Sequence, residues 1–137
     1  MKTDKPVVKM RINIYEENRI LNASPVELVR ILYAAALRSV REAREYLRAG
    51  DIASRSREIN RAEMILLELA SSVDRSQGAE IGDRLLSLYY YMLARLAAAN
   101  AEQSDTPLAE VSELLGTLHE GWSRCDAAEA EPVLATR

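Results

Sequence analysis

The start of the first helix is set by residues 22–28, which read Asn22-Ala-Ser-Pro-Val-Glu-Leu28. Ser24 is a favourable N-cap, because its hydroxyl can accept a hydrogen bond from a backbone N–H that has no partner within the helix. Pro25 takes the first helical position, where its missing N–H costs nothing. Glu27 stands three residues after Ser24 and can complete a capping box. The local chemistry therefore predicts that a helix begins at Pro25.

Four helices are predicted in all, at residues 25–49, 52–73, 79–101 and about 107–126. In each one, apolar residues recur at steps of three and four, which places them on one face of a helix. The four stripes consist of Val29, Tyr33, Ala36, Val40, Ala43 and Leu47; Ile52, Ile59, Ala62, Leu66, Leu69 and Val73; Ile81, Leu85, Leu88, Tyr89, Met92, Leu93 and Leu96; and Leu108, Val111, Leu115, Leu118, Trp122 and Cys125. Arg55 takes one stripe position, where we expect its long side chain to reach water.

Short joints separate these helices. Gly50 suits a left-handed helix end and Asp51 can cap the next helix, while Thr106 or Asp105 can cap a fourth helix that opens at Pro107. Helices of similar length with short joints run antiparallel to their neighbours. The predicted fold is all-α, an antiparallel up-down-up-down four-helix bundle with an N-terminal apolar segment packed against it. The expected divisions are 1–23 as N-terminal segment, 24–127 as bundle and 128–137 as flexible tail.

Composition narrows the class of protein. The chain has 137 residues, of which 48% are hydrophobic and 28% charged, with 5 Gly and 4 Pro, and this suits one helical domain. A formal charge of -3 gives no support for nucleic-acid binding. No run approaches the ~20 apolar residues that cross a bilayer. We expect no cleaved secretory signal, because no apolar run follows the lysines of the N-terminus. The single cysteine suits a reducing compartment. We therefore expect a cytoplasmic protein with no membrane insertion.

The residue types that carry catalysis or bind metals are scarce. His119 is the only histidine, and Gly116 stands where a Glu-x-x-His pair of a di-iron bundle would need its glutamate. No glycine-rich phosphate loop is present, and Cys125 is interpreted as a small core residue. Met64 and Met92 could be considered as haem ligands, but apolar methionines are far more often core fillers. We expect no metal, no cofactor and no enzymatic activity.

Some apolar residues fall outside the stripes and suggest a binding surface. They are Met64 and Leu67 on the second helix and Tyr90, Ala94, Ala97 and Ala101 on the third. If the two sets adjoin, they form a shallow groove that a partner helix can approach closely; a wide core face is an equally open alternative. In the run Tyr89-Tyr90-Tyr91, Tyr89 belongs to the inner face. At least one of the other two should be exposed, either as a plain surface tyrosine or as a partner contact.

The chain resembles the flagellar secretion chaperone FliS family in several segments with the family's order and spacing. They are Asn22-Ala-Ser-Pro-Val-Glu-Leu-Val-Arg-Ile-Leu-Tyr33, Gly50-Asp51, Gly78-Ala-Glu-Ile81, Leu88-Tyr-Tyr-Tyr-Met-Leu93 with Arg95-Leu96, and Trp122. The match runs from about Tyr15 to Trp122. The chain departs from the family at Ala34 and Ala35, where a polar residue and a glycine are frequent, and at Tyr90, where an aspartate is common. These departures could alter local surface contacts.

The resemblance implies a cytoplasmic, non-enzymatic chaperone that binds the disordered C-terminal segment of flagellin. It also implies that the protein prevents premature polymerisation and aids delivery to components of the flagellar type III export apparatus. In the family the N-terminal segment covers part of the binding site, which would give a role to Ile12, Ile14, Tyr15 and Ile20. From the residues alone, a structural module that self-associates through the groove, such as a homodimer of the free form, stays open as an alternative.

Overall fold

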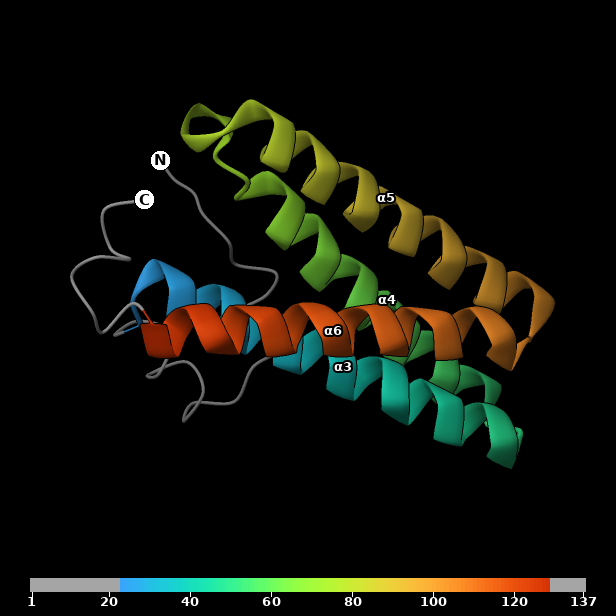
Figure 1. The fold of residues 1–137 in the computed structure, drawn as a ribbon. Helices are drawn as coiled ribbons and strands as arrows, with labels where there is room; N and C mark the ends of the chain where they lie inside the picture. The colour runs from blue at the N-terminus through green and yellow to red at the C-terminus, as the bar shows by residue number, and fades with distance from the viewer. Residues whose placement is uncertain (1–22, 129–137) are drawn as a thin grey trace, which may run out of the picture.

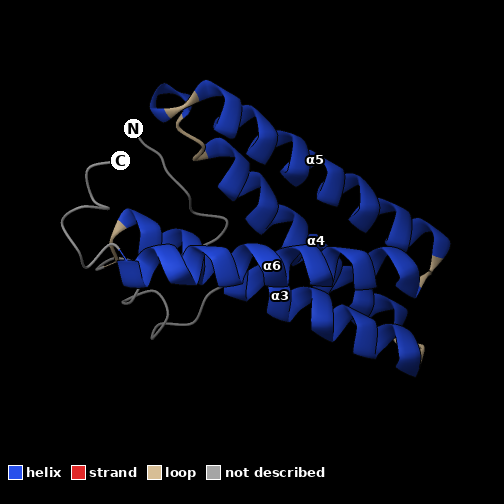
Figure 2. Ribbon diagram, in the orientation of Figure 1, coloured by secondary structure: helices blue, strands red, loops and turns tan. Residues whose placement is uncertain are grey.

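The computed structural model describes residues 23–128, which form four long helices (Figure 1). In chain order the elements are α3 (Pro25–Ala49), α4 (Ile52–Ser71), the short 3₁₀ helix η1 (Arg75–Gln77), α5 (Ala79–Glu102) and α6 (Asp105–Ala128). Within these residues there is no strand (Figure 2). Both α3 and α5 pack against α4 and α6, so α3 and α5 lie diagonally across the bundle. The predicted all-α, antiparallel four-helix bundle is confirmed.

The predicted terminal segments lie outside the described residues. This holds for the apolar N-terminal residues Ile12, Ile14, Tyr15 and Ile20 and for residues 129–137 of the predicted tail, whereas Ala128 is the last residue of α6.

Local hydrogen bonds explain where α3 and α4 begin and end. The Ser24 hydroxyl accepts from the backbone N–H of Glu27 at 3.1 Å, as the predicted N-cap should. Gly50 ends α3 in the left-handed region, at φ +77°, where a side chain would be strained. The Asp51 carboxylate then accepts from the N–H of Ser54 at 3.1 Å and starts α4. The predicted joint between the first two helices is confirmed.

The other two joints differ in detail from the prediction. The second helix ends at Ser71 and not at Val73, and the η1 turn fills the predicted loop. The last helix begins at Asp105, two residues before Pro107. Proline is tolerated there because the first-turn N–H groups of a helix have no acceptor within it. The Ser104 hydroxyl accepts from the N–H of Thr106 at 3.3 Å, so the cap is Ser104 and not Asp105 or Thr106.

A continuous apolar core runs between the helices. Its largest fully buried apolar side chains are Tyr33, Val40, Ile59, Leu66, Leu69, Met92, Leu96, Leu108, Val111 and Leu115, and all of them belong to the predicted stripes. Two stripe positions were wrong, because the side chain of Ile52 is 56% exposed and that of Ile81 is 68% exposed. Both lie in the first turn of their helices, where the neighbouring helices no longer cover them. The stripe is therefore reliable at helix centres and fails at helix ends.

Polar contacts tie the helices together at the end of the bundle that carries residues 50–51 and 103–104, which we name the closed end. The prediction that Arg55 reaches water was wrong, because the residue is only 4% exposed. Its Nε and Nη2 donate to Oδ1 of Asn100 at 3.2 and 3.1 Å, and Ser56 donates to the same oxygen at 3.0 Å. Gln103, held at φ +52°, accepts from Nη1 of Arg55 at 3.4 Å. The oxygens of α5 thus replace the water that the guanidinium has lost.

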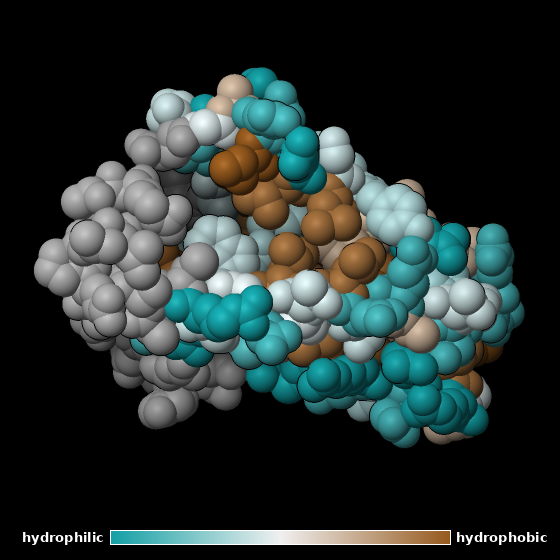
Figure 3. Space-filling model, viewed as in Figure 1, coloured by the Kyte–Doolittle hydropathy of each residue, from teal (hydrophilic) through white to brown (hydrophobic). Residues whose placement is uncertain are grey.

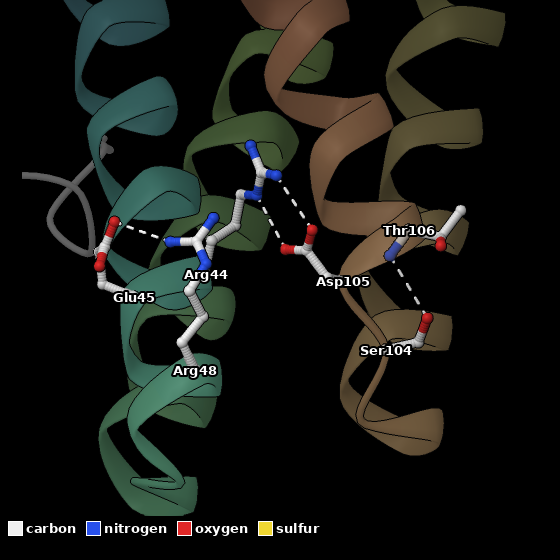
Figure 4. A network of polar contacts seen from close by, with 6 residues as sticks. All are labelled: Arg44, Glu45, Arg48, Ser104, Asp105 and Thr106. Atoms are coloured by element: carbon white, nitrogen blue, oxygen red, sulfur yellow. Dashed lines mark hydrogen bonds and ion pairs between the residues drawn. The ribbon is translucent and has the colours of Figure 1, made fainter.

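A second contact at the closed end joins α3 to α6. Arg44 donates from Nε and Nη2 to the two carboxylate oxygens of Asp105, at 2.8 and 2.9 Å (Figure 4). These bonds hold the pKa of Asp105 below its ordinary value, since they favour the ionised carboxylate. Beside this pair, Arg48 binds Glu45 at 2.8 Å within α3 (Figure 4). A bidentate arginine pair fixes orientation as well as distance, so it sets how α6 lies on α3.

Two adjacent leucines of α4 test the core assignment. Leu66 is fully buried, whereas its neighbour Leu67 is 52% exposed. Leu66→Ala should lower the free energy of unfolding by about 2–5 kcal/mol, because it removes buried methyl groups and leaves a cavity. Leu67→Ala should change it by about 0.5 kcal/mol or less. Urea unfolding followed by circular dichroism measures both, and equal losses would contradict the placement of α4.

The polar closed end gives a second prediction. Asn100→Ala removes the oxygen that accepts from both Arg55 and Ser56, and leaves a buried guanidinium under-bonded. The free energy of unfolding should fall by about 1–3 kcal/mol. Asn60→Ala is the matched control, since Asn60 is an exposed residue of α4 and the change in helix propensity is the same. A smaller loss at Asn100 than at Asn60, measured in the same urea series, would contradict the role of the contact.

Candidate binding site

The end of the bundle opposite the closed end holds an apolar cavity of about 600 Å³, which we name the open-end cavity. Its walls come from the start of α3, the end of α4 with the following turn, the start of α5 and the last turns of α6. The lining residues are Pro25, Val26, Val29, Leu69, Ser72, Val73, Asp74, Gly78, Ile81, Gly82, Leu85, Tyr89 and Trp122. Most of these side chains are apolar, so the cavity suits an apolar ligand.

The cavity opens where α5 and α6 spread apart. The two helices meet at the closed end and diverge toward the start of α5 (Figure 1). Figure 3 shows hydrophobic residues gathered in the hollow between them. On the α6 side, Leu114, Leu118 and Trp122 pack against the core while staying partly exposed, as do Leu85 and Leu88 on the α5 side. Apolar surface left this open is typical of a binding site.

A close contact between the η1 turn and α5 shapes one rim of the cavity. A Cβ atom at Gly82 would lie 3.0 Å from Cγ of Arg75 and 3.3 Å from Cγ1 of Val73, so a side chain there would push these neighbours back by a few tenths of an ångström. Arg75 also pairs with Asp83 at 2.9 Å. The turn is thereby held against the first turns of α5, and Val73 stays on the cavity wall.

Three aromatic residues from three helices meet at the base of the cavity, where Tyr89 and Trp122 line it and Tyr33 lies behind them in the core. The ring centroid of Tyr33 lies 6.4 Å from that of Tyr89 and 6.2 Å from that of Trp122, in tilted arrangements. The two tyrosine hydroxyls are 2.5 Å apart and buried. Burial raises the pKa of both hydroxyls, because it disfavours the phenolate. Both tyrosines are therefore neutral at physiological pH and act only through hydrogen bonds and ring packing.

The predicted site residues lie on a different face, along α4 and α5. Leu67 and Tyr90 are 52% and 56% exposed, and Ala94, Ala97 and Ala101 are also exposed. Ser56 of α4 contacts Asn100 of α5, and Leu67 lies about three helical turns beyond Ser56 on the same face. Because α4 and α5 run antiparallel, the residue level with Leu67 lies about three turns before Asn100 on α5, which is close to Tyr90.

We name the set of Met64, Leu67, Tyr90, Ala94, Ala97 and Ala101 the α4–α5 strip. Its Leu67 and its α5 members lie on adjoining sides of the two helices. Met64 lies three residues before Leu67, on the same side of α4, and is only partly exposed. Glu63 also shares that side, and burial raises its pKa. The role of the strip as a binding surface stays a prediction.

The open-end cavity was missed because most of its large apolar residues were assigned to core stripes. Ile81, Leu85, Tyr89 and Trp122 have the periodicity of core residues, and periodicity does not say whether an opposite side chain fills the space between them. The usable signal was the unusual breadth of the apolar face of α5. The expectation for the tyrosine run was correct, because Tyr89 is buried while Tyr90 and Tyr91 are exposed. Tyr91 donates to Glu110 of α6 at 2.5 Å.

Two further features of the described residues bear on function. Among the side chains that the structure describes, no group of three or more His, Cys, Asp and Glu is placed to hold a metal ion. None of the helices described there is long and apolar enough to span a bilayer. A second hollow, of about 580 Å³ between α3 and α6, is lined by side chains of both charges, among them Arg41, Glu42 and Glu45, with His119 at its edge. The mixed charges favour no particular ligand, so the open-end cavity is the stronger candidate.

Comparison with known proteins gives a consistent picture. The family model described as "Flagellar protein FliS" matches residues 9–129. The flagellar secretion chaperone FliS of Salmonella typhimurium is 30% identical over 118 residues, which cover 85% of this chain and 87% of that protein. The flagellar secretion chaperone FliSB of Pseudomonas aeruginosa is 32% identical over 106 residues, covering 77% and 84%. FliS of Campylobacter jejuni is 31% identical over 110 residues, covering 80% and 86%.

Proposed function

Because this chain belongs to the flagellar protein FliS family of flagellar secretion chaperones, we propose that it binds the disordered C-terminal segment of flagellin in the cytoplasm. By holding that segment it prevents premature polymerisation, and it presents its cargo to the flagellar type III export apparatus. The role needs no covalent chemistry, so we propose a non-enzymatic protein. The observation that carries the proposal is the open-end cavity, a preformed apolar site on a bundle whose opposite end is locked by polar contacts.

The cavity supplies the apolar area that binding of a disordered segment requires. A disordered segment loses conformational entropy when it orders on a surface, and burial of apolar area has to offset that loss. Ile81 is 68% exposed, and Leu85, Leu118 and Trp122 are partly exposed, so the cavity and its rim offer apolar area that is still in contact with water. An amphipathic segment that folds as a helix can place its apolar face there and leave its polar face outside.

We further propose that flagellin contacts the α4–α5 strip. The strip lies on another side of α5 from the cavity, so a long segment would pass around the start of α5 to reach both. Exposed Leu67 and Tyr90 supply apolar contacts, and the exposed alanines allow close approach. Glu63 adds a partly buried carboxylate on the same face, which would favour a basic side chain in the partner.

The proposal predicts one-to-one binding of a flagellin C-terminal peptide, with a gain of helix in the peptide. Isothermal titration calorimetry gives the stoichiometry, and circular dichroism of the mixture should exceed the sum of its parts. Ile81→Ser should weaken binding about tenfold or more, because it removes apolar area at the cavity. Ile52→Ser is the matched control, since Ile52 is a similarly exposed isoleucine at the closed end.

The affinities of these variants for the peptide distinguish the open-end cavity from the α4–α5 strip as the binding surface. Equal effects of Ile81→Ser and Ile52→Ser would count against the cavity, and weaker binding of Leu67→Ser or Tyr90→Ser would support the strip. Absence of peptide binding at tens of micromolar would contradict the chaperone role itself. Light scattering that grows with concentration, without peptide binding, would support a self-associating module instead.

The N-terminal segment gives a separate prediction. Ile12, Ile14, Tyr15 and Ile20 precede the first helix, and Pro25 and Val26, which follow them closely, already line the cavity. We propose that these four residues act as a lid that flagellin displaces. The apparent affinity for flagellin is then lowered, because only the fraction of molecules with an uncovered site can bind.

Deletion of residues 1–21 should tighten peptide binding, or leave it unchanged if the lid is weak, and should increase self-association in light scattering. A deletion that weakened binding with the fold intact would rule out the lid.

A further inference from the structure

The hydroxyl groups of Tyr33 and Tyr89 form a bonded pair at the base of the open-end cavity. Their oxygens are 2.5 Å apart, and the two residues are 0% and 2% exposed. Each phenolic hydroxyl has one proton to donate and can also accept. The bond between the two oxygens uses one proton, so the pair keeps a second proton that needs an acceptor from elsewhere.

The bundle itself supplies no such acceptor. Among the groups that the structure describes, neither hydroxyl bonds to any carboxylate, amide or carbonyl oxygen. The Trp122 side chain lies beside Tyr33, but the indole N–H is a donor and cannot accept. The second proton of the pair is therefore a buried donor without a partner in the described structure, which is an unfavourable arrangement in an apolar site.

The position of the pair shows from where an acceptor can arrive. Tyr33 is enclosed by the core and does not line the cavity, whereas Tyr89 does. Either hydroxyl can donate in their bond. When Tyr33 donates to Tyr89, the free proton lies on Tyr89, the member of the pair that a ligand in the cavity can reach.

We propose that Tyr89 is a specificity-determining residue of the open-end cavity, whose hydroxyl donates a hydrogen bond to a carbonyl or amide oxygen of the bound segment. This inference rests on the proposed function in taking that segment to be part of flagellin. The cavity thus selects an apolar segment that carries one acceptor at its buried end, such as an asparagine or glutamine side chain or a backbone carbonyl at a helix terminus. A segment that is apolar throughout leaves the donor unpaired and binds less well.

Two conservative variants make a matched pair for the test. Tyr89→Phe and Tyr33→Phe abolish the same hydrogen bond between the same two rings, so both should lose similar thermal stability by circular dichroism. They differ in which hydroxyl remains. Tyr89→Phe removes the donor at the cavity, whereas Tyr33→Phe keeps it.

Titration of both full-length variants with the flagellin C-terminal peptide is the first measurement. Tyr89→Phe should weaken binding about threefold to tenfold, the effect of one hydrogen bond. Tyr33→Phe should stay within about twofold of the wild type. Equal affinities for all three proteins, or equal weakening in both variants, would overturn the role of Tyr89 while leaving flagellin binding intact.

A small-molecule comparison tests the donor without flagellin. Acetophenone carries a carbonyl oxygen, and α-methylstyrene has nearly the same shape with a CH₂ group in its place. NMR titration, followed at the methyl signals of Ile81 and Leu85, should show that Tyr89→Phe weakens acetophenone about threefold to tenfold and leaves α-methylstyrene unchanged or tighter. Tyr33→Phe should preserve the wild-type ratio of the two affinities. An unchanged ratio in Tyr89→Phe would overturn the proposal even if the wild type failed to bind the flagellin peptide.

Discussion

The buried guanidinium of Arg55 is the constraint on which the arrangement of the bundle depends. A charge removed from water needs replacement hydrogen bonds in fixed positions, and here Asn100 and Gln103 provide them from the end of α5. These bonds set the register of α4 against α5, while the bidentate pair of Arg44 and Asp105 does the same for α3 and α6. All four helices are thereby aligned at one end by directional contacts, which apolar packing alone does not supply.

Alignment at the closed end leaves the other end of the bundle free to serve binding. The core needs to be filled only as far as the ring of Tyr33, and beyond it α5 and α6 separate around the open-end cavity (Figure 1). A bundle packed tightly along its whole length would have no room for a ligand. A bundle open along its whole length would lose the burial that keeps it folded. With one end held by polar contacts and the other left apolar and open, the bundle has both enough burial to stay folded and room for a ligand.

Much of the fold could be predicted from the sequence, because the deciding signals are local. Ser24, Gly50 and Asp51 act through bonds to residues within three or four positions, and the core stripes follow from helical periodicity. The burial of Arg55 depends on Asn100, a partner far along the chain, and no local pattern reveals it. The cavity was likewise hidden, since Leu85 and Trp122 look like core residues until the packing shows that nothing fills the space between them. Sequence patterns identify which side of a helix faces inward, and only the packing shows where the interior is left empty.

Trp122 gives the molecule an internal optical reporter. It is the only tryptophan of the chain, it lines the open-end cavity, and its ring lies 6.2 Å from that of Tyr33. Indole emission shifts with the polarity of its surroundings, so replacement of water by an apolar ligand beside this ring changes the fluorescence at the site itself. Tyr33 is also close enough to pass its excitation energy to the indole. Occupancy of the cavity can thus be followed on the unlabelled protein by light alone, with any partner that lacks tryptophan.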